Sequence, residues 1–354
     1  MWNKEDEKYM RRCLELAQLG MARAAPNPMV GSVIVYQGKI IGEGYHHKSG
    51  QAHAEVNAIN SVKDQSLLKE STIYINLEPC THYGKTPPCA DLIIEKKIPR
   101  VVIGCVDSFA KVAGKGIEKL KKANCEVKVG ILEKESIHLN RRFFKFHEKK
   151  RPYIILKWAQ TLDGFIDVKR NTNETPDLNW ITNNLSKILV HKWRTEESAF
   201  MIGTNTARND NPKLTVRDWN GRNPIRIVLD RNLSLNQNLQ IFNSDSKTLI
   251  FNEIKSEILN NLEFIKINFD SNILNSILEI LYNKEIQSIV VEGGKMLLES
   301  FINQHLWDEA RIFTGNKYFY DGTKAPCFSG HLINDTMLGD SHLSFYQNLD
   351  SQTK

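Results

Sequence analysis

The sequence lacks any long hydrophobic run. None of its apolar stretches approaches the ~20 residues that a membrane-spanning helix requires. The first ten residues are rich in charge and contain no apolar core, which does not fit a secretion signal. Internal repeats and low-complexity tracts are also missing. We therefore expect a cytoplasmic protein that has no membrane as a partner.

Cysteine is scarce as well, because the 354 residues contain only six. So few cysteines in a chain of this length do not make a disulfide framework. Cys13 lies in a helical pattern and Cys105 in the apolar run VVIGCV, so both are expected to be small core residues. Cys80 and Cys89 differ from them because a histidine and a glutamate lie close by in the sequence.

Length and charge suggest two domains of different character. A chain of 354 residues is long for a single core, and its apolar share of 41% and charged share of 25% are those of an ordinary globular protein. Residues 1–150 contain 25 Lys+Arg and 17 Asp+Glu, a net charge of +8, whereas the remainder contains 22 and 24, a net charge of −2. The basic half is compatible with a phosphorylated substrate or with RNA, and equally with a solvated surface.

Four residues near the front of the chain have the side chains of a hydrolytic zinc site. His53, Cys80 and Cys89 supply one imidazole and two thiolates, which are three of the four ligands of a tetrahedral Zn²⁺. The fourth position would be open to water, and Glu55, two residues after His53, could move the protons of that water. This combination is typical of enzymes that remove an amino group from a heterocycle by hydrolysis.

The alternative interpretation is a structural zinc site, which would use a fourth protein ligand. His46, His47 and His82 are the candidates for that ligand. The spacing of the cysteines adds a further detail. Common zinc deaminases have a short C-x-x-C spacing, whereas here the eight residues THYGKTPP intervene.

The hydrophobic pattern predicts an α/β arrangement in both halves. In the first half we expect helices at 5–20, 53–62, 87–97 and 114–123, a hairpin over 30–47, and strands at 71–79, 100–107 and 125–131. In the second half we expect strands at 153–159, 199–203, 224–230, 247–252, 264–269 and 288–294, and helices at 185–197, 273–283 and 295–302. The charged stretch before Pro152 marks the boundary, which we place between residues 148 and 149.

A glycine pair in the second half is the only feature there that chemistry alone singles out. Gly293 and Gly294 close a predicted strand and open a predicted helix, where backbone N–H groups can hold a phosphate. Such pairs are more often plain turns. The sequence contains no G-x-G-x-x-G, so a Rossmann dinucleotide site is not indicated.

These motifs together resemble one known family. The long insertion between the cysteines, with PNPMVG before it and VAGKGIEKL after it, resembles the deaminase half of the RibD family, the bifunctional deaminase/reductases of riboflavin biosynthesis. The resemblance continues through LKWAQTLDG, NWIT, GTNTARNDNPKLTVR, PIRIVLD and VVEGG in the family's order. It implies an α/β protein with a cytidine-deaminase-like three-layer N-terminal domain at 1–148 and a dihydrofolate-reductase-like α/β C-terminal domain at 149–354.

For the first domain the resemblance implies hydrolytic deamination of 2,5-diamino-6-(5-phosphoribosylamino)pyrimidin-4(3H)-one with one zinc ion per chain. It gives His53, Cys80 and Cys89 the role of zinc ligands and Glu55 that of the catalytic proton shuttle. The substrate-binding positions that it implies are Asn27, His47, His82, Lys85 and Asp107. One departure follows Asp107, since Phe109 stands where the family often has asparagine.

For the second domain the resemblance implies reduction of the ribosyl group by NADPH to give 5-amino-6-(5-phosphoribitylamino)uracil. The cofactor positions that it implies are Gln160, Trp180, Thr206, Asp210, Gly294, Lys295, Met296, Leu297, Leu298, Glu299 and Ser300. The substrate positions are Lys157, Arg194, Leu214, Arg217 and Glu292, and two arginines suit a phosphate. We expect Lys157, Asp210 or Glu292 to polarise the sugar and supply a proton. Trp180 could also be a plain core residue.

Several alternatives stay open at this point. Leu178 stands where the family usually has a serine that contacts substrate, and Asn179 or Thr182 would have to replace it. A deaminase with an inactive reductase half is therefore one alternative. A deaminase of nucleic acid with an RNA-binding second domain and a non-catalytic zinc module are two others. We expect a small-molecule substrate, no nucleic-acid partner, and a homo-oligomer, either a dimer or a tetramer.

Overall fold

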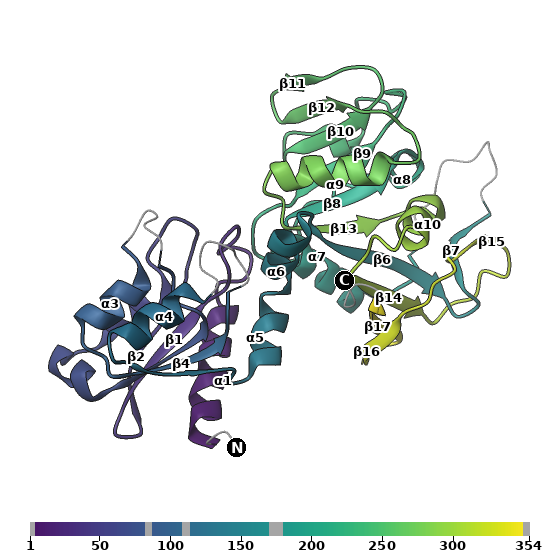
Figure 1. Ribbon diagram of the computed structural model, residues 1–354. Helices are drawn as coiled ribbons and strands as arrows, with labels where there is room; N and C mark the ends of the chain where they lie inside the picture. The colour runs from purple at the N-terminus through teal and green to yellow at the C-terminus, as the bar shows by residue number, and fades with distance from the viewer. Residues whose placement is uncertain (1–3, 82–86, 108–113, 170–179, 350–354) are drawn as a thin grey trace. The chain divides into compact units, whose positions relative to one another are not determined.

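The chain folds into two compact units, Met1–Lys150 and Arg151–Lys354, and each is described by itself. The computed structural model describes residues 4–81, 87–107, 114–169 and 180–349 (Figure 1). The predicted boundary after residue 148 falls in the last turn of α6 (Arg141–Lys149). Among the helices of the described residues, none is long and apolar enough to cross a bilayer.

The first unit is built on a five-stranded sheet with the order β2-β1-β3-β4-β5. β1 runs antiparallel to both β2 and β3, whereas β3, β4 and β5 run parallel to one another. The strands span Gly31–Tyr36 (β1), Lys39–Tyr45 (β2), Thr72–Leu77 (β3), Arg100–Cys105 (β4) and Glu126–Val129 (β5). The sheet is thus partly parallel, and the predicted α/β arrangement of this half is confirmed.

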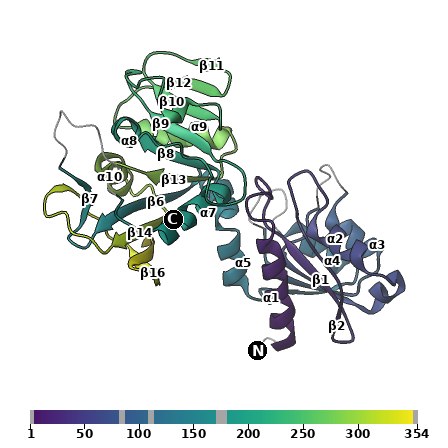
Figure 2. The same cartoon turned by 180° about the vertical axis from the view of Figure 1, so that it is seen from behind.

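Helices cover both faces of this sheet, so the predicted three-layer arrangement is confirmed (Figures 1 and 2). α1 (Lys4–Gln18) packs on one face through the apolar stripe that includes Tyr9, Met10 and Cys13. The other face carries α2 (Ala54–Ser61), α3 (Cys89–Glu95) and α4 (Lys115–Lys122), and a 3₁₀ turn at Gln65–Glu70 precedes β3. Cys13 and Cys105 are buried in the core, as expected.

The end of the first unit is helical, which the sequence analysis did not predict. α5 (Glu133–Leu139) and α6 follow β5, although the second of these segments was taken for a charged boundary. The structure makes it a helix because Phe143 and Phe144 bury one face against Leu77 and Cys105. The many charges of α6 occupy its other positions and had hidden this apolar stripe.

The second unit is built on a ten-stranded sheet with the order β11-β12-β10-β9-β8-β13-β6-β14-β17-β16. The strands from β12 to β14 in this order are parallel, and β11, β17 and β16 pair antiparallel at the two edges. The strands span Tyr153–Thr161 (β6), Ala199–Gly203 (β8), Ile225–Leu229 (β9), Thr248–Asn252 (β10), Glu257–Leu259 (β11), Leu262–Lys266 (β12), Ser288–Glu292 (β13), Glu309–Gly315 (β14), His331–Leu338 (β16) and Ser341–Gln347 (β17).

This sheet also has helices on both faces. α9 (Ile273–Asn283) and α10 (Lys295–Asn303) pack on one face, and α7 (Asn184–Glu196) and α8 (Thr204–Asp210) pack on the other. Its central strands are therefore almost wholly apolar, as buried parallel strands usually are. A two-stranded ribbon of β7 (Phe165–Val168) and β15 (Gly322–Lys324) and a 3₁₀ turn at Gln240–Phe242 complete the unit.

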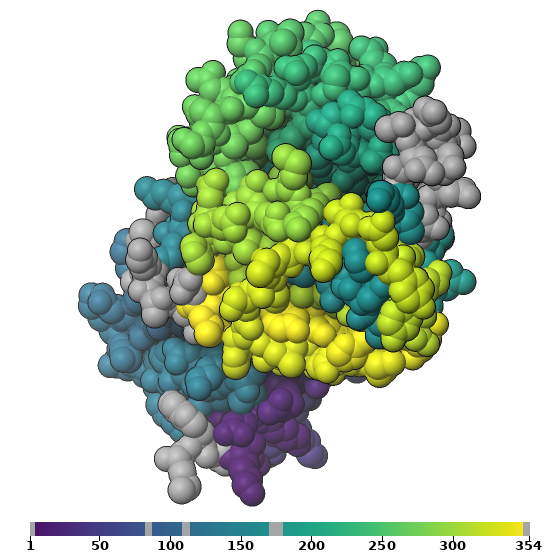
Figure 3. Space-filling model, turned by 90° about the vertical axis from the view of Figure 1, so that its right-hand side faces the viewer, coloured from purple at the N-terminus to yellow at the C-terminus, as the bar shows by residue number. Residues whose placement is uncertain are grey.

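The C-terminal part of the second unit was not predicted from the sequence. β14, β16 and β17 lie beyond the last element that the pattern indicated. β16 is an edge strand with exposed side chains, so it shows no alternation of apolar and polar residues. The C-terminal strands, yellow in Figure 3, form part of the surface of this unit.

Candidate active sites

Three chain segments in the first unit place the predicted zinc ligands at one point. His53 is the N-cap of α2 and has an extended backbone, Cys80 follows the carboxyl end of β3, and Cys89 is the first residue of α3. Pro88 precedes Cys89 as the N-cap of α3, a place where its missing N–H costs no helical hydrogen bond. The site therefore lies where one strand ends and two helices begin.

The donor atoms have the spacing of a metal site. His53 Nδ1 lies 3.6 Å from Cys80 Sγ and 3.3 Å from Cys89 Sγ, and the three donor atoms lie within 4.8 Å of one another. Ligands of a tetrahedral zinc ion with usual bond lengths are about 3.6 Å apart for nitrogen and sulfur. The residues present thus fit Zn²⁺, both in geometry and in the chemistry of the donor set.

The two thiols of the site share hydrogen bonds and charge. A hydrogen bond from Cys89 is the largest influence on Cys80 and helps lower its pKa to about 4, and His53 acts in the same direction. The same hydrogen bond and burial raise the pKa of Cys89. One thiolate is therefore already favoured here, and a bound cation would stabilise the second.

Glu55 is a buried carboxyl beside these ligands. It lies in the first turn of α2 with 3% of its surface exposed. Burial, followed by the charge of Cys80, raises its pKa. α2 holds it there because the helix packs directly on β2, where a Cβ atom on Gly44 would come within 2.4 Å of Ala58 N. A carboxyl of raised pKa at this place can accept and return a proton.

The structure gives His46 a role that the sequence analysis did not assign. Its Nδ1 lies 3.1 Å from the carbonyl oxygen of Ala52, so Nδ1 carries the proton and Nε2 accepts from Asn27 Nδ2 at 3.1 Å. Burial lowers the pKa of His46, which keeps it neutral. His46 therefore orients Asn27, which is a predicted substrate residue.

A fourth protein ligand is not found among the residues that the structure describes. Both nitrogens of His46 are engaged elsewhere, and His47 is exposed and stacks on Tyr45 with ring centroids 4.1 Å apart. His82 and Lys85 lie outside the described residues, as does Phe109. The described residues therefore supply three ligands, the number that a catalytic zinc site takes from the protein.

Asp107 lies beside a second buried carboxylate that the sequence analysis missed. Asp107 is 6% exposed, and its backbone N–H donates to Glu78 Oε2 at 3.3 Å. Glu78 also accepts from the backbone N–H groups of Gly114 at 2.9 Å, Gly116 at 2.8 Å and Ile117 at 3.3 Å. This carboxylate thus connects the turn that carries Cys80 with the start of α4.

The second unit gathers charged side chains at the carboxyl end of β13 and beside the middle of β6. Lys157 on β6 and Glu292 on β13 are cross-strand neighbours, and Lys157 Nζ lies 3.4 Å from Glu292 Oε1. Arg194 on α7 approaches the other carboxylate oxygen at 3.9 Å. Burial alone raises the pKa of Glu292, but the charges of Lys157 and Arg194 outweigh it, and the pKa lies below its usual value.

A glycine pair and a threonine form the turn between β13 and α10. The N–H of Gly294 donates to Thr206 Oγ1 at 2.9 Å, and Gly293 has a φ of +114°. A Cβ atom on Gly293 would lie 2.6 Å from the same oxygen, so the close contact requires glycine. The structure thus brings together Thr206 and Gly294, two predicted cofactor positions that are distant in sequence.

The other predicted cofactor residues have varied surroundings. Gln160 accepts a hydrogen bond from Trp158 Nε1 at 2.9 Å, whereas Trp180 is 55% exposed, so it is not a core residue. On α10, Leu298 is fully buried in the core and Met296 is 80% exposed. The remaining positions are partly exposed or exposed: Asp210, Lys295, Leu297, Glu299 and Ser300. Leu178 and Asn179 lie outside the described residues.

The predicted substrate residues of the second unit adjoin the charged group. Arg194 Nη1 donates to the carbonyl oxygen of Thr215 at 3.1 Å, and Arg217 Nη1 donates to Thr215 Oγ1 at 3.2 Å. Leu214, one residue earlier, is buried and has a φ of +51°, which is unfavourable for a residue with a side chain. Backbone strain of this kind is often found at functional sites.

Comparison with known proteins relates each unit to a family. Residues 3–105 match the family model of the cytidine and deoxycytidylate deaminase zinc-binding region. Residues 152–341 match the model of the RibD C-terminal domain. The first range contains His53, Glu55, Cys80 and Cys89, and the second contains the charged group around Glu292.

Relatives of similar length match almost the whole chain. The riboflavin biosynthesis protein RibD of Aquifex aeolicus is 38% identical over 90% of this chain and 88% of its own, and RibD of Escherichia coli is 33% identical over 91% of each. Among solved structures, the diaminohydroxyphosphoribosylaminopyrimidine deaminase/5-amino-6-(5-phosphoribosylamino)uracil reductase of Thermotoga maritima is 36% identical. It covers 97% of this chain and 98% of its own with a TM-score of 0.88.

Proposed function

The chain belongs to the RibD family of bifunctional deaminase/reductases of riboflavin biosynthesis, and on that premise we propose how its residues divide the two reactions. It is a hydrolase through its first unit and an oxidoreductase through its second. The order of the reactions that we propose is deamination of 2,5-diamino-6-(5-phosphoribosylamino)pyrimidin-4(3H)-one followed by reduction of its ribosyl group.

In the first unit, His53, Cys80 and Cys89 hold the metal and Glu55 moves the protons. A bound zinc ion supplies Lewis acidity and lowers the pKa of water to about 7. Glu55 takes one proton from the attacking water and delivers it to a ring nitrogen of the pyrimidine. It then carries the second proton of that water to the amino group, which leaves as ammonia while the carbonyl forms. Asn27, held by His46, and Asp107 bind the polar edges of the ring, together with His47 and His82, and Lys85 binds the phosphate.

In the second unit, the sugar is bound by the charged group that combines Lys157 in the middle of β6, Glu292 at the carboxyl end of β13, and Arg194. Bound NADPH supplies the hydride, which goes to C1′ of the ring-opened ribose. Lys157 donates to the sugar oxygen and Glu292 holds Lys157 in place, since the two are 3.4 Å apart. Arg194, Leu214 and Arg217 position the substrate, with the guanidinium groups on its phosphate.

The cofactor lies against the turn between β13 and α10 in this proposal. Thr206, Gly294 and the first turn of α10 face the phosphates of NADPH, and Asp210, Gln160 and Trp180 contact its other parts. The Gly294 N–H donates a hydrogen bond to Thr206 Oγ1, which joins the first turn of α8 to the start of α10. This contact supports the assignment, because it places two helix N-termini side by side, where an anionic group is favoured.

The observation that carries the deaminase assignment is the convergence of His53, Cys80, Cys89 and Glu55, and NADPH oxidation tests it together with the reductase. Purified zinc-loaded protein given the diaminopyrimidinone substrate should oxidise NADPH. Glu55→Gln should slow this oxidation ~10²–10⁴-fold, since it removes the proton carrier. Supplying the deaminated product should restore the rate in the same variant. No oxidation by the unaltered protein, even with deaminated product, would overturn the reductase assignment and favour a deaminase with an inactive second half.

Metal analysis tests the zinc proposal separately. Cys89→Ser should lose the single zinc ion per chain and the deaminase activity, because serine is a poor ligand for zinc. The reductase activity of the same variant should stay unchanged. A variant that retains both zinc and deaminase activity would contradict the assignment of Cys89.

We also propose a cytoplasmic location and self-association into a dimer or tetramer. The first is supported by six cysteines that are all free in the structure. The second is supported by the resemblance to a family whose members often self-associate through the second domain, and light scattering of the purified protein would test it.

A further inference from the structure

The reductase site contains a buried histidine to which no role has been given above. His191 lies on α7, one helical turn before Arg194, and is 1% exposed. A histidine so deeply buried needs partners for its polar ring atoms. Its partners all belong to the substrate-binding segment or to the charged residues around it.

One ring nitrogen of His191 holds the backbone of that segment. The backbone N–H groups of Arg217 and Asp218 both donate to His191 Nδ1, at 2.8 Å and 3.1 Å. Nδ1 must therefore be an acceptor, and in the neutral ring the proton lies on Nε2. A protonated His191 could not accept these two hydrogen bonds.

The other ring nitrogen faces charged groups. Nε2 lies 3.7 Å from Asp218 Oδ2 and 3.3 Å from Arg194 Nη1. Since Nε2 carries the ring proton, its contact with the Asp218 carboxylate is electrostatic, and Arg194 Nη1 donates to Thr215 O at 3.1 Å. Burial, followed by the charges of Arg194 and Arg217, lowers the pKa of His191 to about 4, so the ring stays neutral near pH 7.

Two residues of α7 thus bind the backbone of the segment 215–218, one at a carbonyl oxygen and the other at two N–H groups. Arg194 bonds to the carbonyl of Thr215, and His191 bonds to the N–H groups that follow Val216. The side chain of Arg217 extends from the part that His191 holds. The distance between the guanidinium groups of Arg194 and Arg217 therefore depends on the His191 ring.

We propose that His191 is a positioning residue of the reductase, which sets the spacing of Arg194 and Arg217 for the anionic group of the substrate. This inference rests on the proposed function, in which those two arginines bind the phosphate. His191 itself touches neither the reacting sugar nor the cofactor. Its loss should therefore weaken substrate binding more than it slows the chemical step.

Two substitutions distinguish positioning from mere filling of space. His191→Asn places an amide oxygen close to the position of Nδ1, so it can accept the two backbone hydrogen bonds. His191→Leu fills similar space and accepts none. Val190→Ala on the same helix is the matched control, because it removes core packing without altering any group that holds Arg217.

The measurement is steady-state reduction of 5-amino-6-(5-phosphoribosylamino)uracil at pH 7.5. We expect the KM for this substrate to rise about tenfold or more in His191→Leu, with kcat and the KM for NADPH changed by less than about threefold. His191→Asn should keep a KM close to that of the unaltered protein. Inhibition by inorganic phosphate should weaken in His191→Leu in parallel with the substrate.

Two readouts separate this inference from the stability of the protein and from the proposed function. Deaminase activity, measured on the same chains, should not change, and Val190→Ala should lower the unfolding temperature without raising KM. A KM in His191→Leu no higher than in Val190→Ala would overturn the inference. A raised KM in His191→Asn, with an unchanged unfolding temperature, would also overturn the inference. This second variant provides the test if His191→Leu does not fold. An inactive unaltered reductase would instead overturn the proposed function.

Discussion

At the scale of single residues, Glu78 shows how one buried carboxylate can organise a site. It is 4% exposed, and each of its oxygens accepts two backbone N–H groups. Two of the donors lie in the first turns of α4, where a negative charge also suits the helix dipole. Hydrogen bonds to a charged group are stronger than those between neutral groups.

We predict that Glu78→Gln destabilises the first unit by about 2–4 kcal/mol, because an amide offers one acceptor oxygen and turns an N–H donor toward N–H donors. Deaminase activity should fall, since Asp107 and the Cys80 turn lose their common anchor. Calorimetric unfolding and the deaminase rate would check this. Glu118→Gln, which changes an exposed carboxyl on α4, should change neither quantity. Equal effects of both substitutions would contradict the role given to Glu78.

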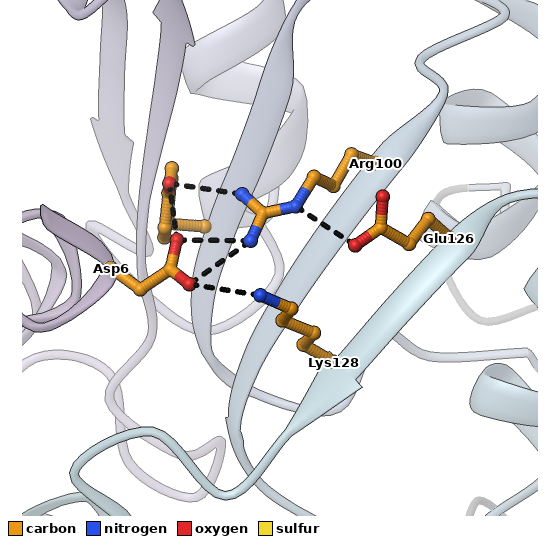
Figure 4. A network of polar contacts seen from close by, with 5 residues as sticks. Asp6, Arg100, Glu126 and Lys128 are labelled. Atoms are coloured by element: carbon orange, nitrogen blue, oxygen red, sulfur yellow. Dashed lines mark hydrogen bonds and ion pairs between the residues drawn. The ribbon is translucent and has the colours of Figure 1, made fainter. Parts of the chain in front are cut away.

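At the scale of elements, helix α1 is fixed to three strands by a polar network (Figure 4). Asp6 on α1 accepts from Tyr74 Oη at 2.8 Å and from Arg100 Nη2 at 3.0 Å, and it lies 3.4 Å from Lys128 Nζ. Arg100 Nε also pairs with Glu126 at 3.2 Å. Burial raises the pKa of Asp6, but the hydrogen bonds of Arg100 and Tyr74 and the nearby positive charges outweigh this effect. The pKa of Asp6 therefore lies below its usual value.

A lowered pKa in the folded state means that the ionised Asp6 stabilises the fold above its unfolded pKa of about 4. This contribution is lost as the pH falls through the folded value. We predict that Asp6→Asn lowers the free energy of unfolding by about 1–3 kcal/mol at pH 7, and that the difference shrinks below pH ~4. Denaturant unfolding at several pH values measures it. Glu15→Gln, exposed on the same helix, is the control, and a difference that stays constant down to pH 3 would disprove the explanation.

The position of the proposed deaminase residues depends on the close contact between α2 and β2. Gly44 allows the helix to approach so closely that a Cβ atom would lie 2.4 Å from Ala58 N and 2.7 Å from Ala54 O. We predict that Gly44→Ala displaces α2, which begins at His53 and carries Glu55, and so lowers both zinc content and deaminase rate at least tenfold. Ile40→Ala, whose side chain is partly exposed on the same strand, should preserve both. Unchanged zinc content in Gly44→Ala would show that the helix tolerates the shift.

At the scale of the whole molecule, each unit contains its own core and the described residues of its own site. The deaminase ligands all precede residue 150, and the charged group of the reductase all follows it. We therefore expect that substitutions in one unit can remove one reaction and leave the other.

We predict that two defective variants complement each other when they are mixed. Glu55→Gln retains the reductase and Glu292→Gln retains the deaminase, so the deaminated intermediate can pass between chains through solution. The mixture should oxidise NADPH after a lag, whereas each variant alone should oxidise it at a rate lower by about 10²-fold or more. Absence of oxidation in the mixture, with both single activities intact, would show that the intermediate does not leave the chain on which it forms.

The sequence predicts a helix or strand only where the hydrophobic pattern of that segment is clear by itself. Buried parallel strands such as β8 and β13, and amphipathic helices such as α1 and α9, are indicated by their own hydrophobic pattern. α6 and β16 are not, because charges mask the apolar stripe of the first and the second is exposed along its length. A pattern of burial can be read only where one face is clearly apolar.

The sequence by itself determined the fold class and the metal-site residues. One histidine, two cysteines and a nearby glutamate have few other uses at this spacing, because their donor atoms are those that zinc prefers. Only the tertiary structure shows the contacts of His46, Glu78, His191 and Asp6. Each of them acts through backbone or side-chain groups that lie far away in the sequence or through burial, and both arise only when the chain is folded.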